Sequence, residues 1–105
     1  MKLKTEKTPG EVFDYAMSFT KELQTGETID SVTVSSTQRY SWRDTTARII
    51  GSEEGYAPEE IGNFAVFWLK GGKAGEVHDV KAQVTTSGGR TLDGFLELRI
   101  VRKKR

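Results

Sequence analysis

The segment that most constrains the fold is the run 64–69, the only unbroken stretch of large apolar residues in the chain. As a β-strand, this run would point alternate side chains to opposite faces of a sheet. The two faces would carry Phe64, Val66 and Trp68 on one side and Ala65, Phe67 and Leu69 on the other. Because both faces are apolar, we expect a central strand covered on both sides, by a second layer of protein or by a partner. We expect Trp68 to anchor the core.

Alternation on the N-terminal side of this run predicts further strands. Large apolar side chains recur at every second position between residues 12 and 19, namely Phe13, Tyr15, Met17 and Phe19. A helix over residues 11–23 is the competing interpretation, because this stretch contains no Gly or Pro, but its apolar stripe would be poorer. β-branched residues favour a second strand over residues 28–36. Residues 40–42 and 47–50 are expected to form two shorter strands around Arg43-Asp44.

A β-hairpin is predicted in the C-terminal part of the chain. Residues 77–86 alternate apolar with polar side chains, and residues 95–101 do the same. The sequence Ser-Gly-Gly-Arg at 87–90 lies between them and is typical of a hairpin turn, because Gly adopts the positive φ angles that tight turns need. We therefore expect Gly88 and Gly89 to form the turn.

Three polar segments accompany the predicted strands. Residues 1–10 are expected to form an N-terminal arm or short edge strand, residues 51–62 an acidic surface loop, and residues 102–105 a solvated basic tail. The loop contains four glutamates and three glycines. It offers little apolar area against an ordering cost of about 1–2 kcal/mol per residue, so we expect it to be mobile in the free protein. Tyr56 and Ile61 are its only sizeable apolar groups.

The length and composition of the chain favour a small all-β domain. A chain of 105 residues has the usual size of one domain, and the absence of cysteine excludes a disulfide framework. Six or seven short strands with glycine-rich turns are typical of a sandwich. We predict a single immunoglobulin-like β-sandwich domain over residues 1–105, with about seven short antiparallel strands.

The charge balance gives no reason to expect nucleic acid or a membrane as a partner. Sixteen Lys and Arg residues nearly match fifteen Asp and Glu residues, so the chain has no strong overall field. No stretch approaches the roughly 20 apolar residues of a membrane span, and the N-terminus lacks the apolar region of a signal peptide. The protein is expected in the cytoplasm when it is made.

No residue pattern supports an active site. The sole histidine, His78, precedes Asp79, so in a strand their side chains would point to opposite faces and could not pair. The glycine-rich segments 71–75 and 87–91 both precede predicted strands, whereas a phosphate-binding loop opens a helix. The acidic loop lacks the ligand spacing of a calcium site. We therefore predict no catalytic, metal-binding or cofactor-binding residues.

Tyr40 and Trp42 lie two positions apart and would share one face of a strand. Packing in the core is the ordinary role of such a pair. A platform for stacking on sugar rings is the alternative.

The sequence resembles a family of small tail-associated structural proteins of tailed bacteriophages and prophages, the fiber-tail adaptor proteins. Residues 67–77 and 84–94 carry most of the resemblance, and the Pro-Gly-Glu-Val-Phe-Asp-Tyr of residues 9–15 is similar to the opening strand of the family. The residues that match the family pattern are Trp68, Leu69, Gly71, Gly72, Ala74, Gly75, Val80, Thr86, Gly89, Arg90 and Thr91. The chain departs from the pattern at His78, where the family favours an aromatic residue, and in the acidic segment 51–62.

The resemblance implies a non-enzymatic phage or prophage virion protein, an adaptor at the head-tail or tail-fiber junction that acts through protein-protein contacts. Its partners would be other virion proteins, with further copies of the chain among them. The second apolar face of the central strand, which bears Ala65, Phe67 and Leu69, is then the expected interface, together with Tyr56 and Ile61. A free-standing immunoglobulin-like or fibronectin-like module that binds carbohydrate is the alternative, and an enzyme is the third.

Overall fold

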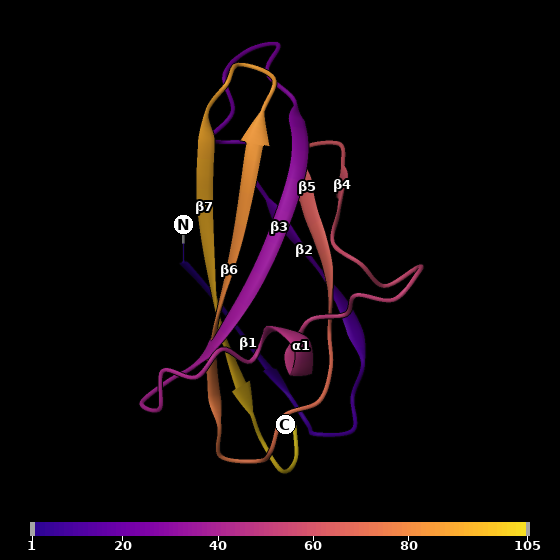
Figure 1. Cartoon of the computed structure of the whole chain (residues 1–105), viewed down its shortest axis with the longest axis vertical. Coiled ribbons are helices and arrows are strands. Elements are labelled where there is room, and N and C mark those ends of the chain that lie inside the picture. The colour runs from indigo at the N-terminus through magenta and orange to yellow at the C-terminus, as the bar shows by residue number, and fades with distance from the viewer. Residues whose placement is uncertain (1, 105) are drawn as a thin grey trace.

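The computed structural model describes residues 2–104 as two β-sheets and one short helix (Figure 1). The strands are β1 (Lys2–Lys7), β2 (Phe13–Ser18), β3 (Ile29–Gln38), β4 (Glu59–Ile61), β5 (Phe64–Leu69), β6 (Val77–Thr86) and β7 (Thr91–Ile100), and the helix is α1 (Thr46–Ile49). One sheet has the strand order β1-β7-β6-β3 and the other the order β2-β5-β4. The expected all-β, sandwich-like fold is confirmed, whereas its immunoglobulin-like connectivity stays a prediction.

The predicted C-terminal hairpin forms the two central strands of the larger sheet. β6 and β7 pair antiparallel from Val77 opposite Arg99 to Thr85 opposite Thr91, and the turn between them contains Gly89 with φ 81°. β7 begins at Thr91, earlier than the apolar pattern indicated. On its other side β7 pairs with β1, so the expected arm or short edge strand is an edge strand, but it pairs in parallel and not antiparallel as expected. Met1, at the start of that arm, lies outside the described residues.

The core lies between the two sheets and draws on both. β5 supplies Ala65, Phe67 and Leu69, each with no exposed surface, and the facing sheet supplies inward side chains of β3, β6 and β7. The remaining buried apolar residues include Met17, Phe19, Val34, Val80, Ala82, Val84, Leu96, Leu98 and Ile100. Phe67 packs against Tyr15 of β2, with ring centroids 5.8 Å apart.

The two faces of β5 are the reverse of the sequence-based expectation. Ala65, Phe67 and Leu69 face the core, so they cannot form the predicted subunit interface. Phe64 is 41% exposed and Trp68 is partly buried on the outer face, so Trp68 is not the core anchor that its phase with Phe64 suggested. Both faces of this strand are apolar, and alternation alone therefore could not decide which of them turns inward.

Lys7 ends β1 with its side chain buried between two loops. Its ammonium group donates to the carbonyl oxygens of Thr8 at 2.8 Å, Pro9 at 3.3 Å and Gly71 at 2.5 Å. Burial lowers the pKa of Lys7, and the charge of Glu11 offsets this effect in part. Lys7 donates all three hydrogen bonds, and the one to Gly71 ties the start of the chain to the loop that follows β5.

The two short strands predicted around Arg43-Asp44 are wrong. Asp44 forms only an isolated bridge with Thr37, and residues 46–49 form the single turn α1, after which Ile50 bridges Leu69. The core role expected for Tyr40 and Trp42 is also wrong, because these side chains are 85% and 76% exposed. Both residues have positive φ angles, 76° and 57°, which a strand does not allow.

The acidic segment 51–62 is only partly a loop. Residues 59–61 form β4, which pairs with β5 and brings Ile61 opposite Phe64. The rest folds back over β5: the Gly51 amide donates to the Trp68 carbonyl oxygen at 2.9 Å, and the rings of Tyr56 and Trp68 meet edge to face at 4.8 Å. The mobility expected for this segment stays a prediction.

The basic tail makes a contact within its own chain. Lys104 donates to the Glu11 carboxylate at 3.1 Å, and its ammonium lies 5.2 Å from the centroid of the Phe13 ring. Arg105 lies outside the described residues. Part of the segment expected to be a solvated tail therefore packs beside the start of β2.

Arg90 joins the β6–β7 hairpin to the loop that connects β2 and β3. Its guanidinium donates to the Glu27 carboxylate, with Nε 3.0 Å from Oε2, and to the Glu22 carbonyl oxygen at 2.8 Å. The Thr86 hydroxyl donates to the same carboxylate at 2.5 Å. Hydrogen bonds from Arg90, the Gln24 amide and Thr86 lower the pKa of Glu27 to about 2.

Glu27 should therefore make stability depend on pH in a defined window. The pKa of Glu27 is lower in the folded state than in the unfolded state. Its contribution to the stability of the fold is therefore complete at pH values above its ordinary pKa of 4.5 and is lost as pH falls toward about 2. We expect Glu27→Gln to lower the melting temperature at neutral pH and this deficit to shrink through that window. Thermal melts across the pH range test this, with Glu54→Gln as the control for an exposed glutamate. A deficit that did not change with pH would contradict the assignment.

Candidate protein-interaction surface

The outer face of the β2-β5-β4 sheet carries exposed apolar side chains. We define the outer apolar face as Val12, Tyr56, Ile61, Phe64 and Trp68. Val12 and Ile61 are each 56% exposed, and Tyr56 and Phe64 are exposed by 43% and 41%. A group of neighbouring apolar side chains of this kind is typical of a protein contact surface, whereas single exposed apolar residues are not.

The local sequence explains how these side chains are brought together. Alternation along β5 places Phe64 and Trp68 on the face turned away from the core, and the pairing with β4 adds Ile61 beside Phe64. The chain can fold back over β5 only because residue 51 is Gly: a Cβ there would lie 2.7 Å from the Tyr56 carbonyl oxygen and 3.1 Å from the Trp68 Cβ. This close approach positions Tyr56 on Trp68.

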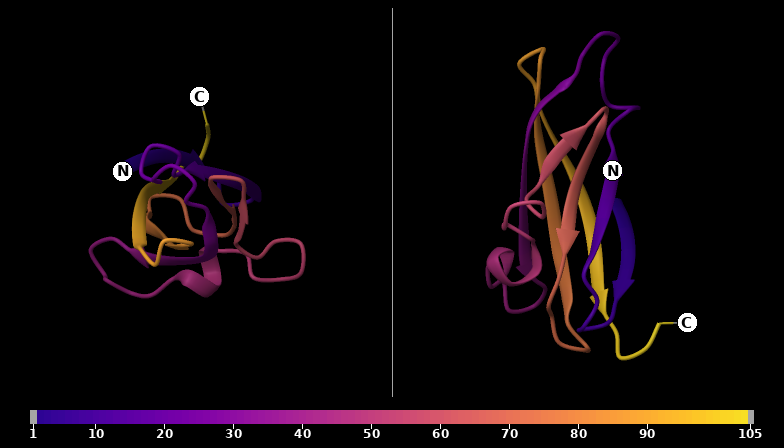
Figure 2. Two further views of the ribbon diagram at one scale, coloured as in Figure 1. Left: turned by 90° about the horizontal axis from the view of Figure 1, so that it is seen from above. Right: turned by 90° about the vertical axis from the view of Figure 1, so that its right-hand side faces the viewer.

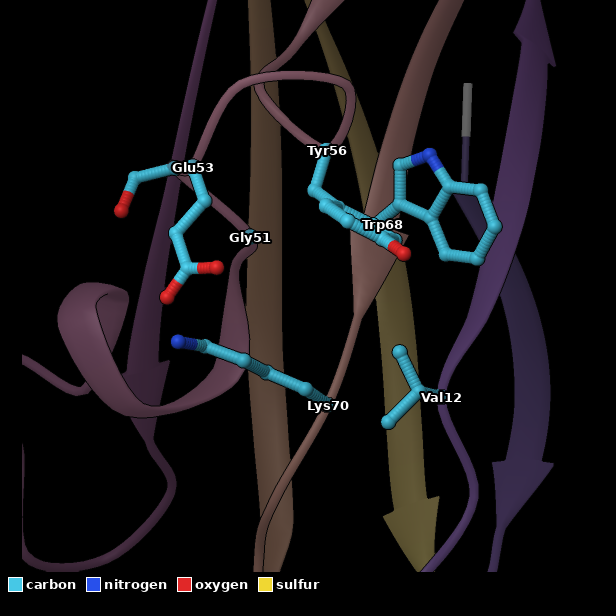
Figure 3. Close-up of a pocket in the computed structure, with 7 residues that line it drawn as sticks. Val12, Gly51, Glu53, Tyr56, Trp68 and Lys70 are labelled. Atoms are coloured by element: carbon cyan, nitrogen blue, oxygen red, sulfur yellow. The ribbon is translucent and has the colours of Figure 1, made fainter.

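A pocket opens beside this aromatic pair (Figure 3). Its volume is about 230 Å³, and Val12, Gly51, Ser52, Glu53, Tyr56, Trp68 and Lys70 line it. Figure 3 shows the side chains of Glu53 and Lys70 on one side of the pocket and Val12 on the other, with the Tyr56 and Trp68 rings above Val12. The pocket thus combines an aromatic wall with a charged rim, an arrangement that suits an inserted aromatic side chain.

A comparison with protein families matches residues 7–99 to the model of the podophage GP4 fiber-tail adaptor protein gp77. The chain belongs to this family. The match spans most of the sequence and includes every strand from β2 to β6 in full. It supports a role for the chain as a structural adaptor of a phage tail. No curated protein matches the sequence.

The residues that carry the resemblance to fiber-tail adaptors have structural positions in the fold. Gly71, Gly72, Gly75 and Gly89 all have positive φ angles, of 60°, 88°, 96° and 81°. Arg90 holds the hairpin to the β2–β3 loop through Glu27. Trp68 lies at the outer apolar face rather than in the core. These positions are consistent with the structural role that the sequence assigned to them, which stays a prediction.

The side chain of His78, in β6 of the larger sheet, is buried in this adaptor. Its ring has no exposed surface; Nδ1 lies 3.0 Å from the Thr45 hydroxyl and Nε2 lies 3.0 Å from the Glu76 carboxylate. The expectation that His78 and Asp79 point to opposite faces of one strand is confirmed, because His78 is buried and Asp79 is partly exposed. Among residues 2–104 there is no group of three or more acidic or histidine side chains that could hold a metal ion. Over the same residues, no helix is long and apolar enough to span a membrane.

The structure separates the candidate interface residues into two groups. Tyr56 and Ile61 lie on the outer apolar face, where contact with another protein stays a prediction. Ala65, Phe67 and Leu69 lie in the core and are excluded from such a contact. The sequence analysis did not predict Val12, Phe64 or Trp68 as surface residues. The alternation along β5 already placed Phe64 and Trp68 on one face of the strand, so it contained the signal for these two.

Proposed function

We propose that this chain joins other virion proteins at the head-tail or tail-fiber junction and that the outer apolar face makes the contact. The observation that supports the proposal is the exposure of neighbouring apolar side chains on a sheet whose other face already lines the core. Covering such a surface removes apolar area from water at roughly 25 cal/mol per Å². Family membership supplies the class of partner.

The proposal assigns no chemical step to the chain. His78, the residue best suited to proton transfer near neutral pH, is enclosed and hydrogen-bonded at both ring nitrogens. A surface contact requires only shape and apolar area. The protein would be made in the bacterial cytoplasm and act in the tail of the assembled particle.

Phe64→Glu tests this function. A carboxylate at the centre of a protein contact must be desolvated without a partner, so we expect the variant to fold and to fail in tail assembly. Phage particles made without the wild-type chain should incorporate added wild-type protein, and their tails should become complete, while the variant should be left out. Protein content and electron microscopy of the particles measure both outcomes.

Thr33→Glu is the matched control, because Thr33 is exposed on β3 of the other sheet. It adds the same charge to a different sheet and should enter particles normally. If Phe64→Glu entered particles as well as the wild-type chain does, the outer apolar face would not be the contact.

A further inference from the structure

The loop that follows β3 presents two aromatic side chains to solvent. We define the aromatic loop as residues 38–44, with the sequence Gln-Arg-Tyr-Ser-Trp-Arg-Asp. Tyr40 and Trp42 are the most exposed large apolar residues that the structure describes, at 85% and 76%. In water such exposure is unfavourable for a Trp side chain, which typically buries about 150–250 Å² in a fold or an interface. Contact with another protein would therefore bury apolar surface that the loop exposes to water.

The backbone of the aromatic loop is fixed in a conformation that costs free energy. Tyr40 and Trp42 have φ angles of 76° and 57°, in the left-handed region that bulky residues avoid. The loop is closed by the Gln38 amide, which donates to the Arg43 carbonyl oxygen, and by the Trp42 amide, which donates to the Gln38 carbonyl oxygen, each at 2.9 Å. Strained backbone of this kind gathers at binding sites, where it orients side chains in advance.

Arg39 anchors the aromatic loop to the larger sheet. Its guanidinium donates to both carboxylate oxygens of Asp79, at 2.5 and 3.2 Å, and pairs with Glu97 at 3.0 Å. Its amide donates to the Val77 carbonyl oxygen at 2.8 Å. A loop held at its base in this way loses little further conformational freedom when its tip binds.

The composition of the loop is that of a protein-binding element. Tyr, Trp and Arg are the residues that most often dominate binding energy at interfaces, because they combine a large apolar body with a polar group. Here Trp42 is flanked in sequence by Ser41 and by the exposed Arg43. A fitting partner would offer a small aromatic-lined pocket with a carboxylate at its rim.

The pocket on the outer apolar face meets this description. Tyr56 and Trp68 form its aromatic wall, and Glu53 stands at its rim. Glu54, next to Glu53, is exposed, and Glu59 in β4 is exposed opposite Val66 on the outer face of β5, so both add negative charge there. Lys70 offsets one of these charges, but the glutamates outnumber it, so the charge of Arg43 on the aromatic loop is complementary to this side of the pocket.

One chain cannot place its own Trp42 in its own pocket. The aromatic loop and the segment that precedes β4 project from opposite sides of the molecule in both Figure 1 and the left view of Figure 2. We propose that Trp42 of one copy inserts into the pocket formed by Val12, Tyr56 and Trp68 of a second copy, with Arg43 beside Glu53. This inference rests on the proposed adaptor function and deepens it by naming a second copy of the chain as a partner of the same surface.

The contact would join two different surfaces, so it would repeat head to tail. Each copy would use its aromatic loop on one neighbour and its pocket on the other. Such an array closes into a ring or continues as a filament, according to the rotation between neighbours. Either arrangement would place several copies in the assembled particle.

Trp42→Gly separates binding from folding. Gly adopts a φ near 57° without strain, which offsets its larger loss of backbone entropy on folding, so the variant should melt at no lower a temperature than the wild-type chain. The same change removes the inserted ring and should weaken self-association at least about thirtyfold, the effect of losing an interface hot spot. Sedimentation velocity over a wide concentration range measures association, and Thr33→Glu should associate as the wild type does.

Mixing two defective chains tests the head-to-tail geometry. Val12→Glu places a carboxylate in the apolar part of the pocket but leaves the aromatic loop intact, whereas Trp42→Gly leaves the pocket intact. Each variant alone should stay monomeric where the wild type associates, and their mixture should form a one-to-one dimer and nothing larger. A mixture that stays monomeric, or a Trp42→Gly chain that associates as the wild type does, would overturn the inference.

Wild-type protein that stays monomeric up to its solubility limit would also overturn the inference. That result would leave the proposed function standing if Phe64→Glu were still excluded from particles. The two proposals therefore fail by different measurements.

Discussion

Phe67→Ala is expected to lower the free energy of unfolding by about 3–5 kcal/mol, the cost of truncating a fully buried Phe. Phe67 has no exposed surface, and its ring lies 5.8 Å from that of Tyr15, centroid to centroid. The truncation removes this contact and leaves a cavity between the sheets that the surrounding strands can close only in part. For a protein of this size each kcal/mol corresponds to about 4–8 °C in melting temperature, so thermal melts would show the loss clearly.

Phe64→Ala on the same strand is the matched control. Phe64 is 41% exposed on the outer face, so its truncation removes less buried apolar area and opens no enclosed cavity. We expect a loss well below that of Phe67→Ala, of about 1 kcal/mol. Equal losses for the two variants, measured by denaturant titration, would mean that both faces of β5 contribute alike to the core.

The sequence predicted the strands well because their signal is local. Alternation at Phe13, Tyr15 and Met17 favoured a strand over the competing helix, and the glycines between residues 86 and 91 identified the hairpin. Neither inference needed to know what packs against the strand. The same argument explains why the order of strands in the two sheets was not predicted, since pairing depends on contacts between distant segments.

The inverted faces of β5 show the limit of local patterns. Phe64, Val66 and Trp68 have more apolar surface than Ala65, Phe67 and Leu69, so size alone favoured the wrong face. The inward face is the one that the opposite sheet and β2 fill, and the pairs Tyr15 with Phe67 and Met17 with Ala65 fix this register. Of these larger side chains, Trp68 is covered in part by Tyr56, through a chain reversal that Gly51 permits.

The candidate site was partly predictable for the same reason. Tyr56 and Ile61 were identified because they are isolated apolar groups in an acidic segment, and both are exposed. The exposed aromatic loop was missed, because Tyr40 and Trp42 have the spacing of a strand face while their positive φ angles come from hydrogen bonds that close the loop. Buried Lys7 was also missed, since its three carbonyl partners come together only in the folded chain.

Gly71→Ala is expected to destabilise the fold by about 2–5 kcal/mol. Gly71 has φ 60°, where an Ala residue costs roughly 1–2 kcal/mol. Its position adds a second cost, because a Cβ would lie 2.6 Å from the carbonyl oxygen of Arg48, and backbone cannot yield as a flexible side chain does. The Gly71 carbonyl oxygen also accepts from buried Lys7, so any shift of this loop disturbs a second set of contacts.

Gly75→Ala isolates the steric part of this effect. Gly75 lies in the same loop with φ 96°, and nothing lies within 4 Å of the position that its Cβ would occupy. Its substitution should cost only the strain of the left-handed backbone, roughly 1–2 kcal/mol. The difference between the two variants in denaturant midpoint then measures the contact of the loop with α1. If Gly75→Ala proved as destabilising as Gly71→Ala, the carbonyl oxygen of Arg48 would not be the reason that residue 71 must be Gly.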